Sequence, residues 1–232
     1  MHFTFVTLFQ NLIEGYFNDS ILKRAISNDL IFVDYINPRE YSKNKHNKTD
    51  DTAVGGGAGM VMTPQPLFVS LESLKEKNND IHIIFTTPVA KSFTQSDAIR
   101  LASQNKHIAF VSGRYEGIDE RVVEKYADEV FSIGDFVLTG GELPSLVMCD
   151  AISRHVNGVL GNNQSLSGES FEKELLEAPN FAKPHNFRNF HAPSEYLKGN
   201  HSKITDLKKE MALCKTQFFR PDLFEHHISR RR

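Results

Sequence analysis

The chain has little of the residue types that cross-link small secreted proteins or hold structural metals. Its 232 residues include no tryptophan and two cysteines, Cys149 and Cys214. The two cysteines lie far apart, with no CxxC spacing and no histidine at metal-binding spacing, which argues against a disulfide framework and against a zinc site. We expect both to be buried free thiols, because an unpaired cysteine packs as a small apolar residue.

Long apolar runs are also missing. No segment approaches the roughly 18 consecutive apolar residues of a membrane span, and the opening MHFTFVTLF has neither the basic leader nor the cleavage site of a signal peptide. With 40% hydrophobic and 24% charged residues, the chain can bury a full core in one larger domain with a smaller one beside it. The composition predicts a cytoplasmic protein without membrane attachment.

The net charge of -2 hides an uneven distribution along the chain. Residues 113–142 contain eight acidic and three basic residues, whereas residues 198–232 contain nine basic and four acidic ones. A basic carboxyl-terminal part is compatible with an anionic partner such as a nucleic acid. It is equally compatible with a solvated helix face.

Strand-like and helix-like segments alternate over the first two thirds of the chain. Short apolar runs predict strands at 3–8, 30–36, 81–85, 107–111 and 129–133. The segments between them predict helices at about 12–27, 66–77 and 94–104, the last with Thr94 at its cap. This alternation favours an α/β fold with a mostly parallel sheet covered on both faces.

Two stretches depart from that alternation. Residues 37–63 are first polar and then glycine-rich, which predicts an irregular segment. After Val156 the sequence GVLGNNQSLSGES is small and polar, as in a linker, and the Phe-rich remainder predicts helices without strands. We place a domain boundary near residues 160–170.

Two glycine-bearing turns, 113–117 and 134–141, each follow a predicted strand. Ligands of open α/β sheets bind where parallel strands end, so these turns are candidate ligand-binding loops. The separate run GGGAG at 55–59 lacks the lysine and the spacing of a phosphate loop. It remains a candidate for close approach to a ligand, whereas the adjacent Asp50 and Asp51 could be ordinary turn residues.

The helix predicted after Gly141 carries an arginine that needs a partner. Leu143, Val147, Asp150 and Arg154 share one side of this helix, and a wide apolar arc predicts that little of it faces water. Arg154 could pair with Asp150 four residues earlier. Alternatively, it could project into a cleft and meet a negative charge.

Aromatic and cationic residues alternate in FAKPHNFRNFHAP at 181–193. This mixture suits stacking on unpaired bases and contact with phosphates. It would also suit a small core of phenylalanines with solvated charges between them. The residues alone therefore indicate an α/β ligand-binding domain joined to a basic helical domain, without naming a reaction.

Several long motifs closely resemble the bacterial tRNA (guanine-N(1)-)-methyltransferase family, in the same order and over nearly the whole chain. They are DDTAVGGGAGMVM (50–62), FTTP (85–88), GRYEGIDERV (113–122), SIGDFVLTGGELP (132–144), DAISR (150–154), GVLG (158–161), ESFEKELLEAPNFAKP (169–184) and LKGNH (197–201). GRYEGIDER and SIGDFVLTGGELP are long and specific, which makes them stronger signals than a single glycine motif.

The resemblance implies a fold and an activity. It implies a SPOUT-type parallel sheet with a deep trefoil knot at residues 1–160, a flexible linker at 161–175, and a small helical tRNA-binding domain at 176–232. The implied reaction transfers a methyl group from S-adenosyl-L-methionine to ring nitrogen 1 of the guanine immediately 3′ of the tRNA anticodon. The resemblance also implies a homodimer with a shared active site and assistance by Mg²⁺, although no dedicated metal cage is visible in the sequence.

The resemblance also assigns site residues. The implied cofactor-binding residues are Phe85, Thr86, Thr87, Pro88, Gly113, Glu116, Ser132, Ile133, Gly134, Asp135, Phe136, Val137, Leu138, Gly140, Gly141 and Pro144. The implied tRNA-binding residues are Asp50, Gly55, Gly56, Gly57, Gly59, Lys183, His185 and Arg188. A carboxylate at Glu116 could favour the cationic sulfonium, whereas the acids of GIDER could instead cap a helix.

Two residues are implied to be catalytic. Arg154 matches the cation that stabilises charge on the guanine oxygen. Glu169 stands where the family has an aspartate as the base, and the extra methylene changes its reach. Phe136 in place of a common tyrosine and Ala58 in place of a proline are milder departures.

Two other interpretations stay open. The chain could be another SPOUT-type methyltransferase that acts on a different RNA position, or a non-catalytic RNA-binding relative that has kept the fold.

Overall fold

The computed structural model describes residues 1–161, 168–171 and 174–230. Internal contacts divide the chain into an amino-terminal unit, Met1–Asn162, and a carboxyl-terminal unit, Asn163–Arg232. Within the described residues, every helix is too short or too polar to cross a membrane. Most of the predicted linker, residues 162–167 and 172–173, lies outside the described residues.

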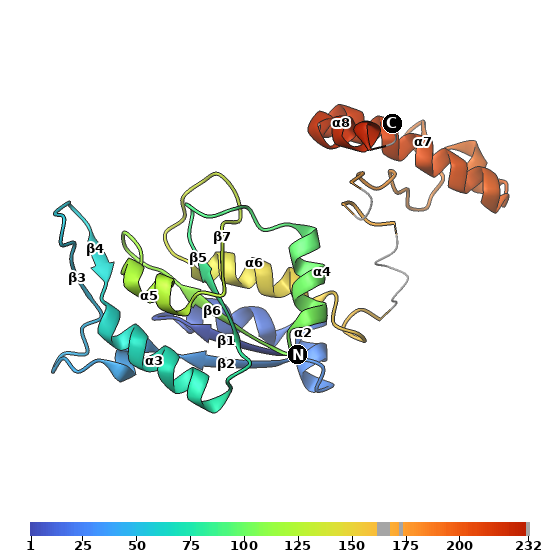
Figure 1. Ribbon diagram of the computed structural model, residues 1–232. Coiled ribbons are helices and arrows are strands. Elements are labelled where there is room, and N and C mark those ends of the chain that lie inside the picture. Colours follow the sequence, from blue (N-terminus) through green and yellow to red (C-terminus); the bar gives the residue numbers. More distant parts are fainter. Residues whose placement is uncertain (162–167, 172–173, 231–232) are drawn as a thin grey trace. The chain divides into compact units, whose positions relative to one another are not determined.

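A five-stranded sheet forms the centre of the amino-terminal unit (Figure 1). Its order is β2-β1-β6-β5-β7, and every neighbouring pair is parallel. The strands are β1 (His2–Val6), β2 (Phe32–Ile36), β5 (His82–Thr86), β6 (His107–Ser112) and β7 (Glu129–Phe131). Each lies within a few residues of a predicted strand, so the α/β class with a parallel sheet is confirmed.

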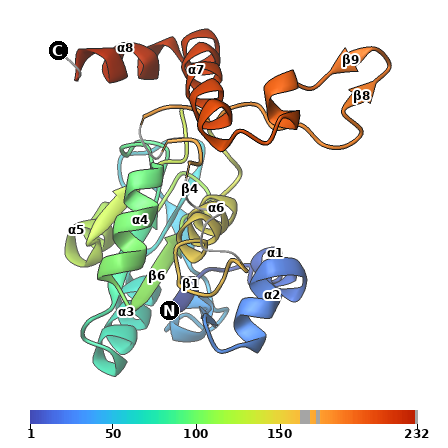
Figure 2. The ribbon, with the colours of Figure 1, turned by 90° about the vertical axis from the view of Figure 1, so that its right-hand side faces the viewer.

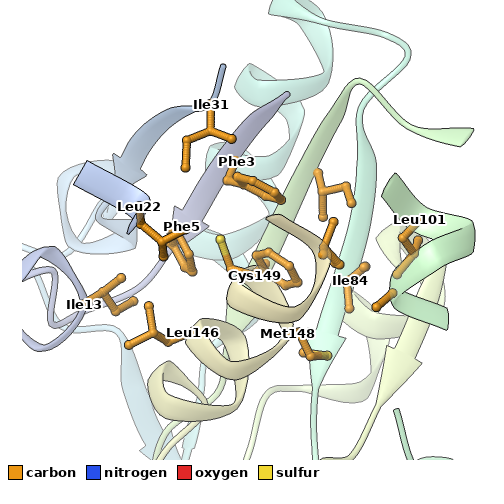
Figure 3. Packing of buried hydrophobic residues seen from close by; sticks show 14 of the residues in the cluster. Phe3, Phe5, Ile13, Leu22, Ile31, Ile84, Leu101, Leu146, Met148 and Cys149 are labelled. Atoms are coloured by element: carbon orange, nitrogen blue, oxygen red, sulfur yellow. The ribbon is translucent and has the colours of Figure 1, made fainter. Parts of the chain in front are cut away.

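Helices cover both faces of this sheet, as the alternation predicted. They are α1 (Asn11–Glu14), α2 (Ser20–Ser27), α3 (Pro64–Lys77), α4 (Gln95–Gln104), α5 (Glu120–Tyr126) and α6 (Glu142–Ser153). One apolar core joins the sheet to α1, α2, α4 and α6, and a second joins it to α3 and α5. In Figure 3, Leu146 and Cys149 of α6 lie in the first core with Phe5 of β1.

The prediction of one continuous helix at 12–27 is wrong. The chain there forms α1, a 3₁₀ helix η1 (Gly15–Asn18) and then α2. Asp19 separates η1 from α2 because its backbone is extended and its carboxylate accepts a hydrogen bond from the Ser20 amide. At α4 the predicted cap is confirmed: Thr94 and Asp97 form a reciprocal capping box.

The segment 37–63 is more ordered than predicted. It contains a 3₁₀ helix, η2 (Pro38–Tyr41), and an antiparallel hairpin of β3 (Asp50–Thr52) and β4 (Met60–Met62). Asp50 and Asp51 therefore belong to a strand rather than to a turn. The glycine-rich run forms the loop that joins β3 to β4.

Helix α6 is more exposed than predicted. Leu143 is 55% exposed and Val147 is 44% exposed, although both belong to its wide apolar arc. The opposite side of α6 packs in the core with Met148 and Ile152. A helix in the outer layer of a three-layer fold buries one face on the sheet, so the remaining apolar side chains stay at the surface of the single chain.

The two cysteines have different environments. Cys149 of α6 is buried, and burial raises the pKa of its thiol. Cys214 is exposed on α7 (His201–Phe219), so its predicted burial is wrong. A long helix in a small unit leaves most of its circumference in solvent.

The carboxyl-terminal unit contains α7, α8 (Pro221–Ser229) and a 3₁₀ helix, η4 (Ser194–Leu197). It also contains a short antiparallel hairpin of β8 (Asn186–Phe187) and β9 (Phe190–His191), which the sequence did not predict (Figure 2). Two-residue strands are too short to give a periodic pattern in the sequence. Thr216 ties this unit together, because its hydroxyl accepts a hydrogen bond from the Leu176 amide at 2.9 Å.

Two histidine side chains stack on each other at the amino-terminal ends of the neighbouring strands β1 and β6. The rings of His2 and His107 are parallel, with centroids 4.0 Å apart. Asn78 Nδ2 donates to His107 Nδ1 at 2.9 Å, so His107 Nε2 carries the proton and donates to Thr4 Oγ1 at 2.8 Å. Burial and the neighbouring His2, which itself contacts Asp34, lower the pKa of His107 to about 4.

The lowered pKa of His107 predicts that the protein loses stability as the pH falls. In the unfolded chain this histidine has an ordinary pKa of about 6.5. Below that pH the unfolded chain binds a proton that the folded chain does not bind, so the free energy of unfolding decreases as the pH falls. Between pH 8 and pH 5 the loss should be about 2 kcal/mol in the free energy of unfolding. Denaturant titrations at several pH values measure it.

The matched control is His107→Gln, which retains polar contacts but does not titrate. We expect the difference in unfolding free energy between the two proteins to narrow by this amount as the pH falls. Two curves that run parallel from pH 8 to pH 5 would contradict the assignment of this effect to His107.

Candidate active site

A cavity of about 660 Å³ opens at the carboxyl-terminal ends of three neighbouring strands, β6, β5 and β7. The loops that follow these strands form its walls, together with the first turn of α6. This is the edge at which open parallel sheets bind ligands, and the volume is within the range of about 300–1,000 Å³ for small-molecule sites. The two glycine-bearing turns both lie here, as the sequence predicted.

Backbone hydrogen bonds join the three loops to one another. Phe93 N donates to Ser132 O at 2.7 Å, and Ser132 N donates to Lys91 O at 2.9 Å. Farther along, Gly141 N donates to Gly113 O at 2.8 Å. The walls of the cavity are therefore held by contacts between loops that are far apart in the sequence.

Gly141 is required at the point where two of these loops cross. A Cβ atom at this position would lie 2.7 Å from the Gly113 nitrogen and 2.8 Å from the Ser112 Cα, and it would also overlap the Thr86 hydroxyl. Backbone atoms cannot move aside as a flexible side chain can. The glycine therefore permits a close approach of backbones rather than an unusual backbone conformation.

A buried ion pair fixes the loop before α6. Glu142, the first residue of α6, is buried and lies 2.8 Å from Arg114 Nε, and it accepts a hydrogen bond from Thr7 Oγ1 at 2.9 Å. Arg114 also donates to Thr139 O at 3.2 Å and lies over the Phe9 ring, 4.5 Å from its centroid. Arg114 thus connects the loop after β6 to the loop that precedes α6.

Most of the predicted cofactor-binding residues line this cavity, and Gly134 and Asp135 are the two that do not. The lining also includes residues that sequence reasoning missed: Val89, Ala90, Arg114, Tyr115, Gly117, Ile118, Glu120, Val123, Val130 and Phe131. Arg114 and Tyr115 belong to the GRYEG motif, so their position after a strand was the signal that could have identified them. Tyr115 has a left-handed backbone, with φ 60°, which is uncommon outside turns and functional loops.

Glu116 lines the cavity and also contacts the β3–β4 hairpin. A Cβ atom at Gly59 would overlap the Glu116 side chain, so the glycine lets the hairpin loop lie directly against this carboxylate. Glu116 N donates to Met60 O at 2.9 Å, which holds the contact in place. In contrast, space around Gly55, Gly56 and Gly57 is open.

The acids of EGIDER, residues 116–121, have two different roles. Asp119 caps α5, because its side chain accepts a hydrogen bond from the Arg121 amide. This confirms the helix-capping interpretation for Asp119. Glu116 lies before the helix and lines the cavity instead.

Arg154 lies away from this cavity, at the carboxyl-terminal end of α6. It lines a second cavity of about 320 Å³ on the outer side of that helix, together with Leu143, Val147 and Asp150. Asp150 accepts a hydrogen bond from the Tyr16 hydroxyl, which raises the pKa of Tyr16. Ten residues separate Pro144 from Arg154, which corresponds to about 15 Å along a helix.

Four of the remaining predicted site residues belong to the carboxyl-terminal unit. Glu169 is half-buried outside any helix or strand, and Lys183, His185 and Arg188 are exposed in and beside the β8–β9 hairpin. Asp50, also a predicted tRNA-binding residue, is half-buried at the start of β3.

The lining of the first cavity suits a ligand with apolar and cationic parts. Ile133, Phe136 and Leu138 supply apolar surface, and Glu116 and Glu120 supply carboxylates. Among the described residues there is no group of three or more His, Cys, Asp or Glu side chains that could hold a metal ion.

Comparison with known proteins identifies the family of this chain. Residues 1–226 match the model of a protein family described as tRNA (Guanine-1)-methyltransferase TrmD. The chain is similar to proteins named tRNA (guanine-N(1)-)-methyltransferase from several bacteria. One from Sulfurimonas denitrificans is 69% identical over 227 residues, covering 98% of both chains. One from Sulfurovum sp. is 63% identical over 228 residues, covering 98% of this chain and all of the relative.

A third relative with the same name, from Campylobacter jejuni, is 58% identical over 231 residues and 98% of each chain. Matches at this identity and coverage span both units of the structure, so neither unit is an addition peculiar to this chain. The chain belongs to the tRNA (guanine-1)-methyltransferase family.

Proposed function

We propose that the protein methylates ring nitrogen 1 of the guanine immediately 3′ of the tRNA anticodon, with S-adenosyl-L-methionine as the methyl donor. The observation that carries this proposal is the cavity at the ends of β5, β6 and β7, lined by most of the residues that the family resemblance assigns to the cofactor. Membership of the family supports the substrate.

The cavity fits the proposed donor in three respects. Loop glycines allow backbone groups to approach the adenosine and methionine parts closely. The apolar side chains of Ile133, Phe136 and Leu138 can cover the faces of the adenine ring, and the carboxylate of Glu116 can face the cationic sulfur. When bound, S-adenosyl-L-methionine supplies an electrophilic methyl group on a sulfonium.

The protein must remove a proton from the guanine and stabilise the charge that remains. Glu169 is the proposed base: its carboxylate takes the proton from guanine N1. The electron pair left on nitrogen forms the new bond to the methyl carbon while the bond from that carbon to sulfur breaks, so that neutral S-adenosyl-L-homocysteine leaves. Once the proton has left and before the methyl group is transferred, negative charge spreads toward guanine O6, where the Arg154 guanidinium is proposed to donate hydrogen bonds. The extra methylene of Glu169 requires a slightly longer approach than the aspartate of the family.

The position of Arg154 supports a shared active site in a homodimer. Within one chain, Arg154 belongs to the second cavity rather than the first. A second copy that packs on the exposed α6 face, where Leu143 and Val147 are accessible, could supply its own Arg154 and Glu169 to the first copy's cavity. A symmetric dimer then contains two such composite sites.

The proposed fold of the amino-terminal domain, residues 1–160, includes a deep trefoil knot of the SPOUT type. The hydrogen bonds of Phe93 with Ser132 and of Gly141 with Gly113 support it, because they join three loops that cross near the cavity. We propose that the helical domain at 176–232 binds the tRNA. In this arrangement Lys183, His185 and Arg188 contact phosphates, and Asp50 and the 55–59 glycines help to recognise the guanine. A cytoplasmic location follows from the proposed substrate.

Methyl transfer to two tRNA transcripts tests the proposed reaction. One transcript has consecutive guanines at the 3′ edge of the anticodon, and the other has the target guanine replaced. We expect labelled 1-methylguanosine in the first transcript alone, identified by mass after digestion to nucleosides. Methylation at another position would favour a different SPOUT-type specificity. Cofactor binding without transfer would favour a non-catalytic relative.

Substitutions of Glu169 test the proposed base. Glu169→Gln removes the proton acceptor but keeps the size of the side chain, so kcat should fall by a factor of about 10²–10⁴. Binding of S-adenosyl-L-methionine, measured by calorimetry, should persist. Glu169→Asp should remain active because it keeps the carboxylate. An unchanged rate for Glu169→Gln would remove this residue from the mechanism.

Mixing two inactive variants tests whether the active site is shared. Leu138→Trp fills the cavity of its own subunit, and Arg154→Ala removes the cation. If the partner supplies Arg154, mixed dimers have one complete site, and random exchange of subunits should restore about a quarter of the wild-type activity. If Arg154 acts within its own subunit, no mixed dimer has a complete site. Absence of recovery after verified exchange would therefore contradict the shared site.

A further inference from the structure

The β8–β9 hairpin presents two phenylalanines in a defined arrangement. Phe187 and Phe190 are direct cross-strand partners on either side of a two-residue turn, so their side chains leave the same face of the hairpin. The turn residues Arg188 and Asn189 both have positive φ, 51° and 67°. This conformation matches the twist of a tight hairpin.

Further hydrogen bonds extend and fix the hairpin. Ala192 N donates to His185 O at 2.9 Å, one position beyond the paired strands. Asn189 N donates to Asn186 Oδ1 at 3.1 Å, which holds the turn. The two rings are therefore carried on an ordered backbone, so little ordering of the chain would be needed when a partner binds.

Both rings are exposed to solvent. Phe187 is 61% exposed and Phe190 is 80% exposed. In contrast, Phe181 of the same motif packs edge-on against Tyr196, with ring centroids 5.8 Å apart. Within the Phe-rich motif, Phe181 is 47% exposed and contacts Tyr196, whereas Phe187 and Phe190 are more exposed. Figure 2 shows the hairpin extending from the helical part of the unit.

The surroundings of the two rings are cationic. The Arg188 guanidinium carbon lies 5.4 Å from the centre of the Phe187 ring. Residues 178–194 contain Lys183, Arg188, His185 and His191 and no acidic residue. This charge complements the phosphates of a nucleic acid, and exposed aromatic faces bordered by cations are typical of surfaces that bind unpaired nucleotides.

We propose that the β8–β9 hairpin is a stacking platform for an unpaired base of the RNA substrate, with Phe187 and Phe190 contacting the base and Arg188 the adjacent phosphate. The proposal rests on the proposed tRNA-binding function of this unit and extends it from phosphate contacts to base contacts. A base in a duplex is already stacked on both sides, so the platform selects RNA with an accessible loop. An apolar protein surface is a poorer match, because it would have to bury the neighbouring cations without compensating charges.

The absence of tryptophan from the natural chain provides a direct test. Phe190→Trp introduces a single indole, whose fluorescence is quenched when a base stacks on it. The probes are an RNA stem-loop with the unpaired loop of a tRNA anticodon arm and a fully paired RNA of equal length and charge. We expect strong quenching by the stem-loop and little by the paired RNA. The control is Phe32→Trp, on β2 of the other unit, which should respond to neither.

Affinity measurements on paired substitutions separate stacking from apolar contact. Replacing Phe187 and Phe190 together by leucine keeps apolar bulk but removes the aromatic faces, and we expect Kd for the stem-loop to rise about tenfold or more. Replacing both by tyrosine keeps the rings and should leave Kd within about twofold. Circular dichroism confirms that the variants stay folded.

Three results would overturn the proposal. Equal quenching by paired RNA would indicate phosphate contact alone. Wild-type affinity in the leucine variant would show that aromatic faces are not needed. A change in sedimentation of the leucine variant without a change in RNA affinity would instead assign the face to a second copy of the chain. Because these measurements record binding, they remain informative if methyl transfer to the proposed guanine is not observed.

Discussion

The close crossing of backbones at Gly141 is the constraint on which the candidate site depends. At this point the segment that leads into α6 lies against the ends of β5 and β6, and the Gly141–Gly113 hydrogen bond joins them. The cavity exists because these loops cross beside the sheet instead of leaving it separately. Even a methyl group at position 141 would push the backbones apart, so the shape of the cavity and the direction of α6 are determined together.

The ion pair between Arg114 and Glu142 strengthens this arrangement at an electrostatic cost. Burying a carboxylate is unfavourable unless it is well paired, and Glu142 is surrounded by Arg114 and the Thr7 hydroxyl. Loss of Arg114 or of Glu142 would leave the charge of the other residue buried without compensation. The main effect of the pair is therefore to fix the position of the loop before α6, rather than to add stability. Such preorganisation is useful where a ligand must be held within a fraction of an ångström for reaction.

The groups to which the proposed mechanism assigns roles lie on three separate parts of the chain. The cavity, the Arg154 face of α6, and Glu169 with the hairpin of the carboxyl-terminal unit each carry part of the proposed chemistry. Under the proposed mechanism, turnover depends on assembly and on bound RNA, because the proposed base, the proposed cation and the methyl donor meet only in the complex. The exposed apolar residues of α6 and the exposed rings of the hairpin are the surfaces that we propose for two different partners, protein and RNA.

The sequence by itself determined the alternating α/β pattern, the Thr94 cap and the loops after β6 and β7 that line the cavity, because these depend on local periodicity and on glycine motifs. It did not determine the break at Asp19, the exposure of Leu143 and Cys214, or the β8–β9 hairpin. Tertiary structure decided which apolar face of a helix meets the sheet, and it placed Arg154 apart from the cavity and Gly59 against Glu116. Contacts between residues distant in the chain leave no local pattern, so such placements follow only from packing in three dimensions.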